Sequence, residues 1–149
     1  NYTVLERGKS GVNLVQYNYK TGKKAATLIN AEDLVFNSKP LRMQSYEFSS
    51  DEKKVLIGTE IEAIYRRSSK ANFFVYDLKS KKIEQLAKED KQMYADFSPS
   101  GNKVAYVMNN NLFFKDFTTN KVVQITEDGE FNKIRNGASR YNARYWRFK

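Results

Sequence analysis

One twelve-residue pattern occurs twice in this chain. Residues 47–58 read EFSSDEKKVLIG, and residues 96–107 read DFSPSGNKVAYV, at an offset of 49 positions. The matching pairs are Phe48 with Phe97, Ser49 with Ser98, Lys54 with Lys103 and Val55 with Val104. An internal period of this kind is the sequence signature of repeat architectures, so it constrains the fold more than any other feature of the chain.

The repeat continues beyond these segments. Residues 73–90, FFVYDLKSKKIEQLAKED, align with residues 112–129, LFFKDFTTNKVVQITEDG, at an offset of 39. The smaller offset means that ten additional residues lie in the earlier unit, within residues 58–72. A fainter third copy covers residues 14–29, where Tyr17 and Asn18 stand in place of the later Tyr-Asp pair.

Each unit predicts four short strands separated by turns. In the last unit the predicted strands are residues 94–98, 103–108, 112–117 and 122–126. The second of these is almost continuously apolar, which is typical of a strand buried on both faces. Asp77 and Asp116 follow the third strands, where a carboxylate can accept hydrogen bonds from the backbone of the next turn. A four-stranded unit that recurs about every 40 residues is typical of a β-propeller blade.

The fold prediction is therefore an all-β, partial β-propeller of about three four-stranded antiparallel blades. We divide the chain into a partial blade (1–45), a blade with an insertion (46–90), a blade (91–130) and an atypical basic tail (131–149). Because a closed propeller needs about four to eight blades, a fragment leaves blade faces uncovered. Either the chain belongs to a larger protein, or copies self-associate through the exposed blade edges.

Composition excludes several kinds of site. The chain has no Cys and no His, so it can build neither a Ser-His-Asp triad nor a Cys/His zinc site. No phosphate-binding loop or calcium loop is present, and we expect no metal and no cofactor. No apolar run of about 18 residues predicts a membrane span. Asn1 is not a natural start, so we expect a trimmed sequence from which targeting information can have been removed.

The net charge of +9 raises the question of a nucleic-acid partner. Lysines cluster in turn-like segments, KTGKK, SDEKK and LKSKK, which is typical of solvated turns. Tyr141, Tyr145 and Trp146 alternate with basic residues and could stack on a single strand. Because this stretch is confined to the tail and carries no binding motif, we expect no nucleic-acid partner.

Several segments together resemble the N-terminal propeller region of the dipeptidyl peptidase IV family. They are YEFSSDEKKVLI, YRRS followed by FFVYDL, FSPSGNKVAYVMNNNLF and QITEDGEFNKIRNG. The resemblance implies an eight-bladed propeller followed by an α/β-hydrolase domain that carries the Ser-Asp-His triad. It also implies release of Xaa-Pro dipeptides from short peptides, and a location that is exported, periplasmic or at the cell surface. The C-terminal hydrolase domain would then be the main partner of this chain, which would be non-catalytic alone.

The insertion carries the residues that the resemblance assigns to substrate binding. Arg66 matches a family arginine that binds the carbonyl oxygen of the substrate dipeptide. A guanidinium suits this role because it stays charged and presents several donors in a fixed plane. Tyr65 matches a bulky aromatic that could wall the cavity, although packing is the alternative role. Arg67 is expected to be an exposed loop cation, and Ser68 to form local hydrogen bonds.

The resemblance breaks down in the tail. In the family, the Asn-Gly pair is followed by two glutamates that bind the free α-amino group of the substrate. Here the corresponding positions are Arg144 and Tyr145, so we assign the amine-binding role to no residue of this chain. The alternative to a peptidase segment is a free-standing propeller-type module that binds a peptide or protein.

Overall fold

The computed structural model describes residues 1–65 and 68–137, and this part of the chain forms an all-β structure. The strands are β1 (Tyr2–Arg7), β2 (Val12–Tyr17), β3 (Lys24–Ile29), β4 (Val35–Phe36), β5 (Lys39–Pro40), β6 (Ser45–Phe48), β7 (Lys54–Tyr65), β8 (Ser68–Asp77), β9 (Ile83–Gln85), β10 (Met93–Phe97), β11 (Lys103–Met108), β12 (Asn111–Asp116) and β13 (Lys121–Gln124). A single 3-10 turn, Ala31–Asp33, follows β3 within these residues.

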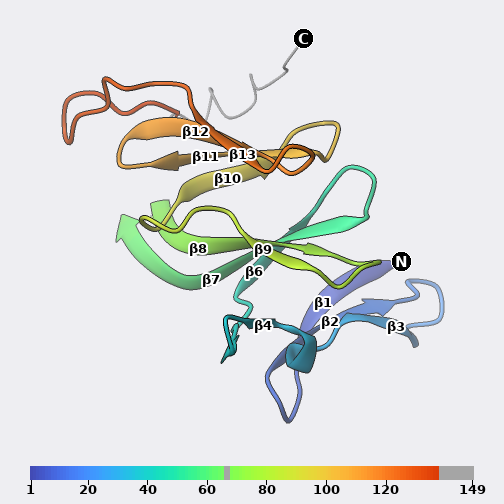
Figure 1. The fold of residues 1–149 in the computed structure, drawn as a ribbon. Coiled ribbons are helices and arrows are strands. Elements are labelled where there is room, and N and C mark those ends of the chain that lie inside the picture. Colours follow the sequence, from blue (N-terminus) through green and yellow to red (C-terminus); the bar gives the residue numbers. More distant parts are fainter. Residues whose placement is uncertain (66–67, 138–149) are drawn as a thin grey trace.

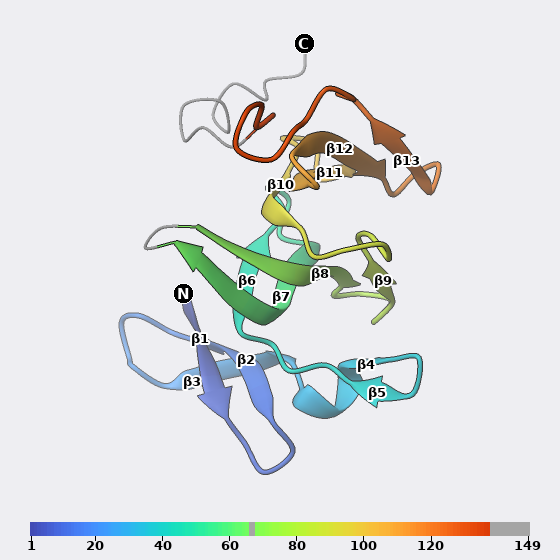
Figure 2. The ribbon, with the colours of Figure 1, turned by 90° about the vertical axis from the view of Figure 1, so that its left-hand side faces the viewer.

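The strands form three main antiparallel sheets, each with its strands in chain order. They are β1-β2-β3, β6-β7-β8-β9 and β10-β11-β12-β13, with the short β4-β5 pair between the first and second. Figures 1 and 2 show the three sheets stacked one on the next, from the N-terminal sheet to the β10–β13 sheet. This arrangement confirms the all-β, partial-propeller prediction, and we call the sheets the first, second and third blades. The exact division of the chain at residues 45, 90 and 130 stays a prediction.

The repeated sequence exists because two turns have the same structure. Ser49 and Ser98 are both buried, and each side-chain oxygen accepts a hydrogen bond from the backbone N–H of the matching lysine, Lys54 at 3.0 Å and Lys103 at 3.1 Å. Each serine carbonyl also accepts a bond at 2.8 Å from a residue with positive φ, Glu52 in one turn and Gly101 in the other. A buried hydroxyl needs such partners, which explains why both copies keep the serine.

The second repeated turn follows the third strand of the second and third blades. Asp77 Oδ1 accepts hydrogen bonds from the backbone N–H groups of Lys79 and Ser80, and Asp116 Oδ1 does the same for Thr118 and Thr119. These contacts confirm the predicted turn role of both aspartates. In the first blade Asn18 Oδ1 accepts equivalent bonds at 2.9 and 3.1 Å, as its place in the faint third copy indicates.

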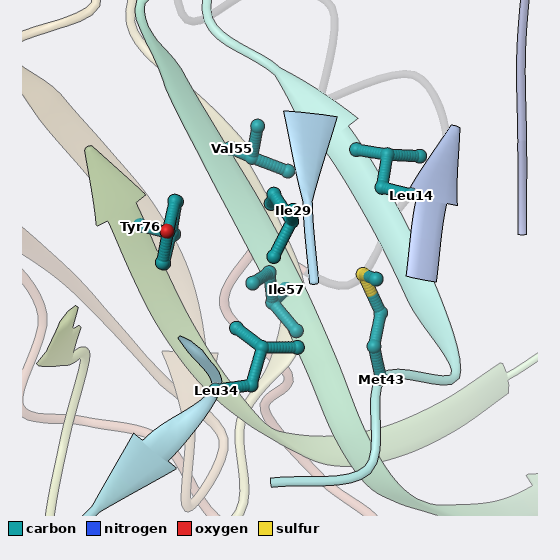
Figure 3. Close-up of a cluster of buried hydrophobic side chains, with 7 residues drawn as sticks. All are labelled: Leu14, Ile29, Leu34, Met43, Val55, Ile57 and Tyr76. Carbon is teal, nitrogen blue, oxygen red and sulfur yellow. The ribbon is translucent and has the colours of Figure 1, made fainter. Parts of the chain in front are cut away.

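Two apolar clusters hold the blades together. The first joins the first and second blades through seven buried side chains (Figure 3): Leu14, Ile29, Leu34, Met43, Val55, Ile57 and Tyr76. The second cluster joins the second and third blades, with Leu56 and Val75 on one side and Val104 and Tyr106 on the other. Because each fully buried aliphatic side chain stabilises a fold by about 1.5–3 kcal/mol, these clusters fix the blade stacking.

The outer strand of the third blade is exposed. All four residues of β13 are exposed, and Val122 and Val123 are 52% and 40% accessible. Ile125, which follows the strand, is 43% accessible. This surface fits the expectation that a partial propeller leaves blade surfaces uncovered. Self-association through it stays a prediction.

Candidate functional site

The insertion in the second blade lengthens the β7-β8 hairpin. Strand pairing between β7 and β8 runs from Lys54↔Asp77 through Thr59↔Asn72 and continues to Tyr65↔Ser68. The pairing shifts between Thr59 and Glu62, where Glu60 has a φ of 50°. A bulge of this kind bends and twists a strand pair. The hairpin consequently projects beyond the rest of its blade, as Figure 2 shows.

An ionic cluster supports the projecting hairpin from the third blade. Lys91, just before β10, has its Nζ 2.6 Å from Glu62 Oε1 and donates to the carbonyl oxygen of Glu60 at 2.8 Å. On the hairpin itself, Lys70 Nζ lies 3.4 Å from Glu62 Oε2, and Asn72 Nδ2 donates to Glu60 Oε2 at 2.8 Å. The Lys91 side chain is only 18% accessible, so these oxygens replace much of the water around its ammonium group.

Gln92 joins the hairpin base to the third blade. It is fully buried, and its backbone N–H and carbonyl exchange hydrogen bonds with Ala71 at 2.8 and 2.9 Å. Its side-chain oxygen accepts a bond from the backbone N–H of Phe73 at 3.1 Å. Its side-chain nitrogen donates to the carbonyl oxygen of Asp90. Every polar group of this buried glutamine therefore has a partner across or next to the blade junction.

A cavity opens at the same junction, beside β6 and β10, the first strands of the second and third blades. Its volume is about 320 Å³. The lining residues are Ser45, Tyr46, Glu47, Leu56, Ser69, Phe73, Tyr94 and Ala95. They belong to β6, β7 and β8 of the second blade and to β10 of the third. We call it the inter-blade cavity.

Among the lining residues within 1–65 and 68–137, Glu47 is the one that carries an ionisable carboxyl or a charge. Partial loss of solvent raises the pKa of Glu47 to about 7, assisted by the negative charge of Asp96 and a hydrogen bond with it. Glu47 is nevertheless exposed, so ligands and solvent can reach its carboxyl. At neutral pH this carboxyl is therefore poised between its neutral and charged forms.

Comparison with known proteins places this architecture in a family. The family model of the dipeptidyl peptidase IV N-terminal region matches residues 49–144, most of the chain. The chain belongs to this family. Its structure superposes on that of dipeptidyl peptidase 4 from Porphyromonas gingivalis with a TM-score of 0.76 and 36% identity, over 87% of this chain and 18% of that one. The expected resemblance to the dipeptidyl peptidase IV family is thus confirmed.

Two relatives show how much of a family protein this chain represents. A probable dipeptidyl-aminopeptidase B of Podospora anserina is 42% identical over 84 residues, which are 54% of this chain and 9% of that protein. Prolyl endopeptidase FAP of Homo sapiens is 31% identical over 126 residues, which are 84% of this chain and 16% of that protein. The chain therefore spans less than a fifth of each of these family members. The tricorn protease, at 14% identity and a TM-score of 0.54, shares the fold alone.

Of the two predicted substrate-binding residues, Tyr65 belongs to the described part of the chain and Arg66 does not. Tyr65 is the last residue of β7, and Ser68 is the first of β8. Arg66 and Arg67 lie between them, outside the described residues, as do Arg144 and Tyr145 of the tail. The roles assigned to Arg66 and Tyr65 stay predictions. The hairpin and the inter-blade cavity share β7 and β8, with Ser69 of the hairpin in the cavity lining.

The sequence reasoning missed Glu47, Tyr94 and Lys91. A signal for Glu47 was present, since it stands 49 positions before Asp96, at the same place in the repeat. Adjacent blades bring equivalent positions together, so an acid repeated at one place predicts a pair of neighbouring carboxyls. Nothing in the sequence near Tyr94 or Lys91 indicated their contacts, which depend on how the blades stack.

Two further findings concern metals and membranes. Within residues 1–65 and 68–137, no three acidic, His or Cys side chains come together as metal ligands. None of the helices in the same residues has the length and apolar character needed to cross a membrane.

Proposed function

We propose that this chain is the N-terminal propeller segment of a serine-type dipeptidyl peptidase that releases Xaa-Pro dipeptides. In this proposal the chain is not catalytic itself. It forms part of the wall of the substrate cavity and restricts access to short peptides. The observation that carries the proposal is the family match across residues 49–144, together with the hairpin that projects from the second blade.

In the proposal, Arg66, which follows β7 in the sequence, binds a carbonyl oxygen of the substrate, and Tyr65 forms part of the wall of the substrate cavity. The contacts of Lys91 with Glu60 and Glu62 support this assignment, because they hold the base of the hairpin against the next blade. A binding group on a projecting hairpin needs such support to stay in place. A guanidinium held there can donate to a carbonyl oxygen without changing its protonation state.

The catalytic triad of this proposal comes from a C-terminal α/β-hydrolase domain that packs against the propeller. This chain has no His, which is consistent with a triad supplied entirely by the other domain. The proposal also places the protein outside the cytoplasm, in the periplasm or at the cell surface, where short peptides arrive from outside.

The test uses the complete protein that contains this chain. We expect it to hydrolyse a chromogenic Xaa-Pro anilide, and the isolated 149-residue chain not to do so. Arg66→Ala should raise KM by about 10- to 100-fold, the effect of losing one charged hydrogen bond. Arg67→Ala is the matched control and should leave KM within about twofold of the parent value, as expected of an exposed loop cation.

Two results would contradict the proposal. If the complete protein fails to cleave Xaa-Pro substrates, the assigned activity is wrong. If Arg66→Ala and Arg67→Ala have the same small effect while cleavage is normal, the activity stands and the role of Arg66 is wrong.

A further inference from the structure

The residues that line the inter-blade cavity all lie within residues 1–65 and 68–137. Its lining comes from β6, β7, β8 and β10, so both of the neighbouring blades that build it are present. Its volume of about 320 Å³ lies at the lower end of the range for small-molecule sites, and a single amino-acid side chain fits in it.

Aromatic residues make up much of the cavity lining: Tyr46, Phe73 and Tyr94. Phe73 packs against the second apolar cluster, toward the third blade, and its backbone N–H donates to Gln92. The Tyr46 ring instead packs against the first apolar cluster, and its hydroxyl donates to the carbonyl oxygen of Thr3 at 2.9 Å, so Tyr46 holds β6 in place from the other side. Gly58 lies beneath this wall, since a Cβ there would collide with the Ser45 hydroxyl and lie 3.3 Å from the Phe73 ring.

Tyr94 has an unusual backbone. Its φ is 52°, and the pairing of β10 with β11 shifts between Met93 and Asp96. A left-handed conformation costs an ordinary residue about 1–2 kcal/mol. Bulges often re-aim a side chain next to a binding site. Here the bulge leaves Tyr94 38% accessible and in the lining of the cavity.

The polar groups of the cavity suit a positive ligand. Glu47 brings a carboxyl, and Ser45 and Ser69 bring hydroxyls that can accept hydrogen bonds. Among residues 1–65 and 68–137, neither Glu47 nor its neighbour Asp96 forms an ion pair. The two carboxyls share a hydrogen bond, and a cation at the cavity would reduce the repulsion between their charged forms. Aromatic faces add further attraction for the same kind of group.

We propose that the inter-blade cavity binds one organic cation, an alkylammonium or guanidinium group, with Glu47 as its counter-ion and the rings of Phe73 and Tyr94 as its wall. The cation can come from a basic side chain or from the free amino terminus of a peptide. The proposal does not require peptidase activity. It concerns residues other than Arg66 and Tyr65.

The test is calorimetric titration of the complete protein with three probes of similar size. N-acetyl-lysine amide carries only a side-chain ammonium, norleucine amide carries only an α-ammonium, and N-acetyl-norleucine amide is neutral. We expect at least one cationic probe to bind, and the neutral probe to bind at least about tenfold more weakly, as loss of a charge-assisted contact predicts. The cationic probe that binds more tightly identifies the source of the cation.

Variants assign the binding to this cavity rather than to another site of the protein. Glu47→Gln keeps the shape of the side chain and should weaken binding of the cationic probe by about tenfold. Glu127→Gln is the matched control, since Glu127 is exposed and outside the cavity lining, and it should leave the affinity unchanged. Tyr94→Ala should weaken binding by a few-fold through loss of a ring.

Equal binding of the neutral and cationic probes would overturn the proposal, as would an unchanged affinity in Glu47→Gln. If Glu47→Gln does not fold, an unchanged affinity in Tyr94→Ala would overturn it. These outcomes are separate from the proposed peptidase function, because binding is measured by heat and not by cleavage. A protein that cleaves no Xaa-Pro substrate but loses probe affinity in Glu47→Gln would support this inference alone.

Discussion

The side-chain oxygen of Gln92 accepts a hydrogen bond from the backbone N–H of Phe73 at 3.1 Å, across the junction between the second and third blades. Gln92 is fully buried, and Phe73 lines the inter-blade cavity. The amide side chain of Gln92 thus provides the hydrogen-bond acceptor for a backbone N–H of β8 at the edge of the cavity. The same bond links the second blade to the third. The junction is therefore held by polar contacts as well as by the apolar cluster around Leu56 and Val104.

Replacing Gln92 by Ala should destabilise the fold by about 2–3 kcal/mol, because it leaves the buried N–H of Phe73 without a partner. Urea unfolding measures this change. Gln124→Ala is the matched control: Gln124 is exposed, donates one bond to the carbonyl oxygen of Thr126, and should cost less than about 1 kcal/mol. Equal costs for the two variants would show that Gln92 does not hold the junction.

Tyr106 offers a test of an unsatisfied buried group. Its hydroxyl is buried and has no hydrogen-bond partner within the described residues. Tyr106→Phe should therefore leave the free energy of unfolding unchanged or raise it by up to about 2 kcal/mol at pH 7, since no bond is lost. Tyr46→Phe is the control, because the Tyr46 hydroxyl bonds to Thr3 and its removal should destabilise the fold. A clear loss of stability in Tyr106→Phe would mean that the hydroxyl has a partner.

The same tyrosine predicts a loss of stability in alkali. Burial, with a smaller effect of the charge on Glu89, raises the pKa of Tyr106 to about 12. In the unfolded chain the Tyr106 hydroxyl ionises near the ordinary tyrosine pKa of about 10, so the folded state favours its neutral form. This contribution is complete below about pH 10 and is lost as the pH rises from 10 to 12. Unfolding measured across that range should show a smaller decline in Tyr106→Phe, and parallel curves would contradict the assignment.

Glu52 occupies a position that its repeat partner fills with glycine. Its φ is 54°, and Gly101 at the equivalent place has a φ of 67°. Glu52→Gly should stabilise the fold by a few tenths to about 1 kcal/mol, because relief of the left-handed strain exceeds the added flexibility of glycine. Thermal unfolding measures the shift. Gly101→Ala is the reciprocal change and should destabilise, so a stabilising Gly101→Ala would overturn the explanation.

Lys91 should control how firmly the long hairpin is held. Lys91→Met removes the contacts with Glu60 and Glu62 while keeping a long apolar stem. We expect faster amide hydrogen exchange in the hairpin beyond Thr59↔Asn72 and unchanged exchange in β11. Lys88→Met, an exposed lysine a few residues earlier, should change neither. Uniformly faster exchange throughout the blade would indicate general destabilisation instead.

The sequence alone determined the blade pattern of this protein, because that pattern depends on local interactions. Buried serines at 49 and 98 and the turn acids at 77 and 116 make hydrogen bonds within a few residues of themselves, so their spacing is visible as a repeat. The long hairpin was likewise visible as ten additional residues in one copy. The family resemblance followed from the same segments.

Only the tertiary structure decided what lies between the blades. Stacking brings Glu47 beside Asp96, places the Tyr94 ring on a bulge at the cavity, and sets Lys91 against the hairpin of another blade. These contacts join residues about 30 to 50 positions apart, and they depend on the angle and distance at which two sheets pack. A sequence period records which positions are equivalent, but the packing of apolar side chains determines which of them meet.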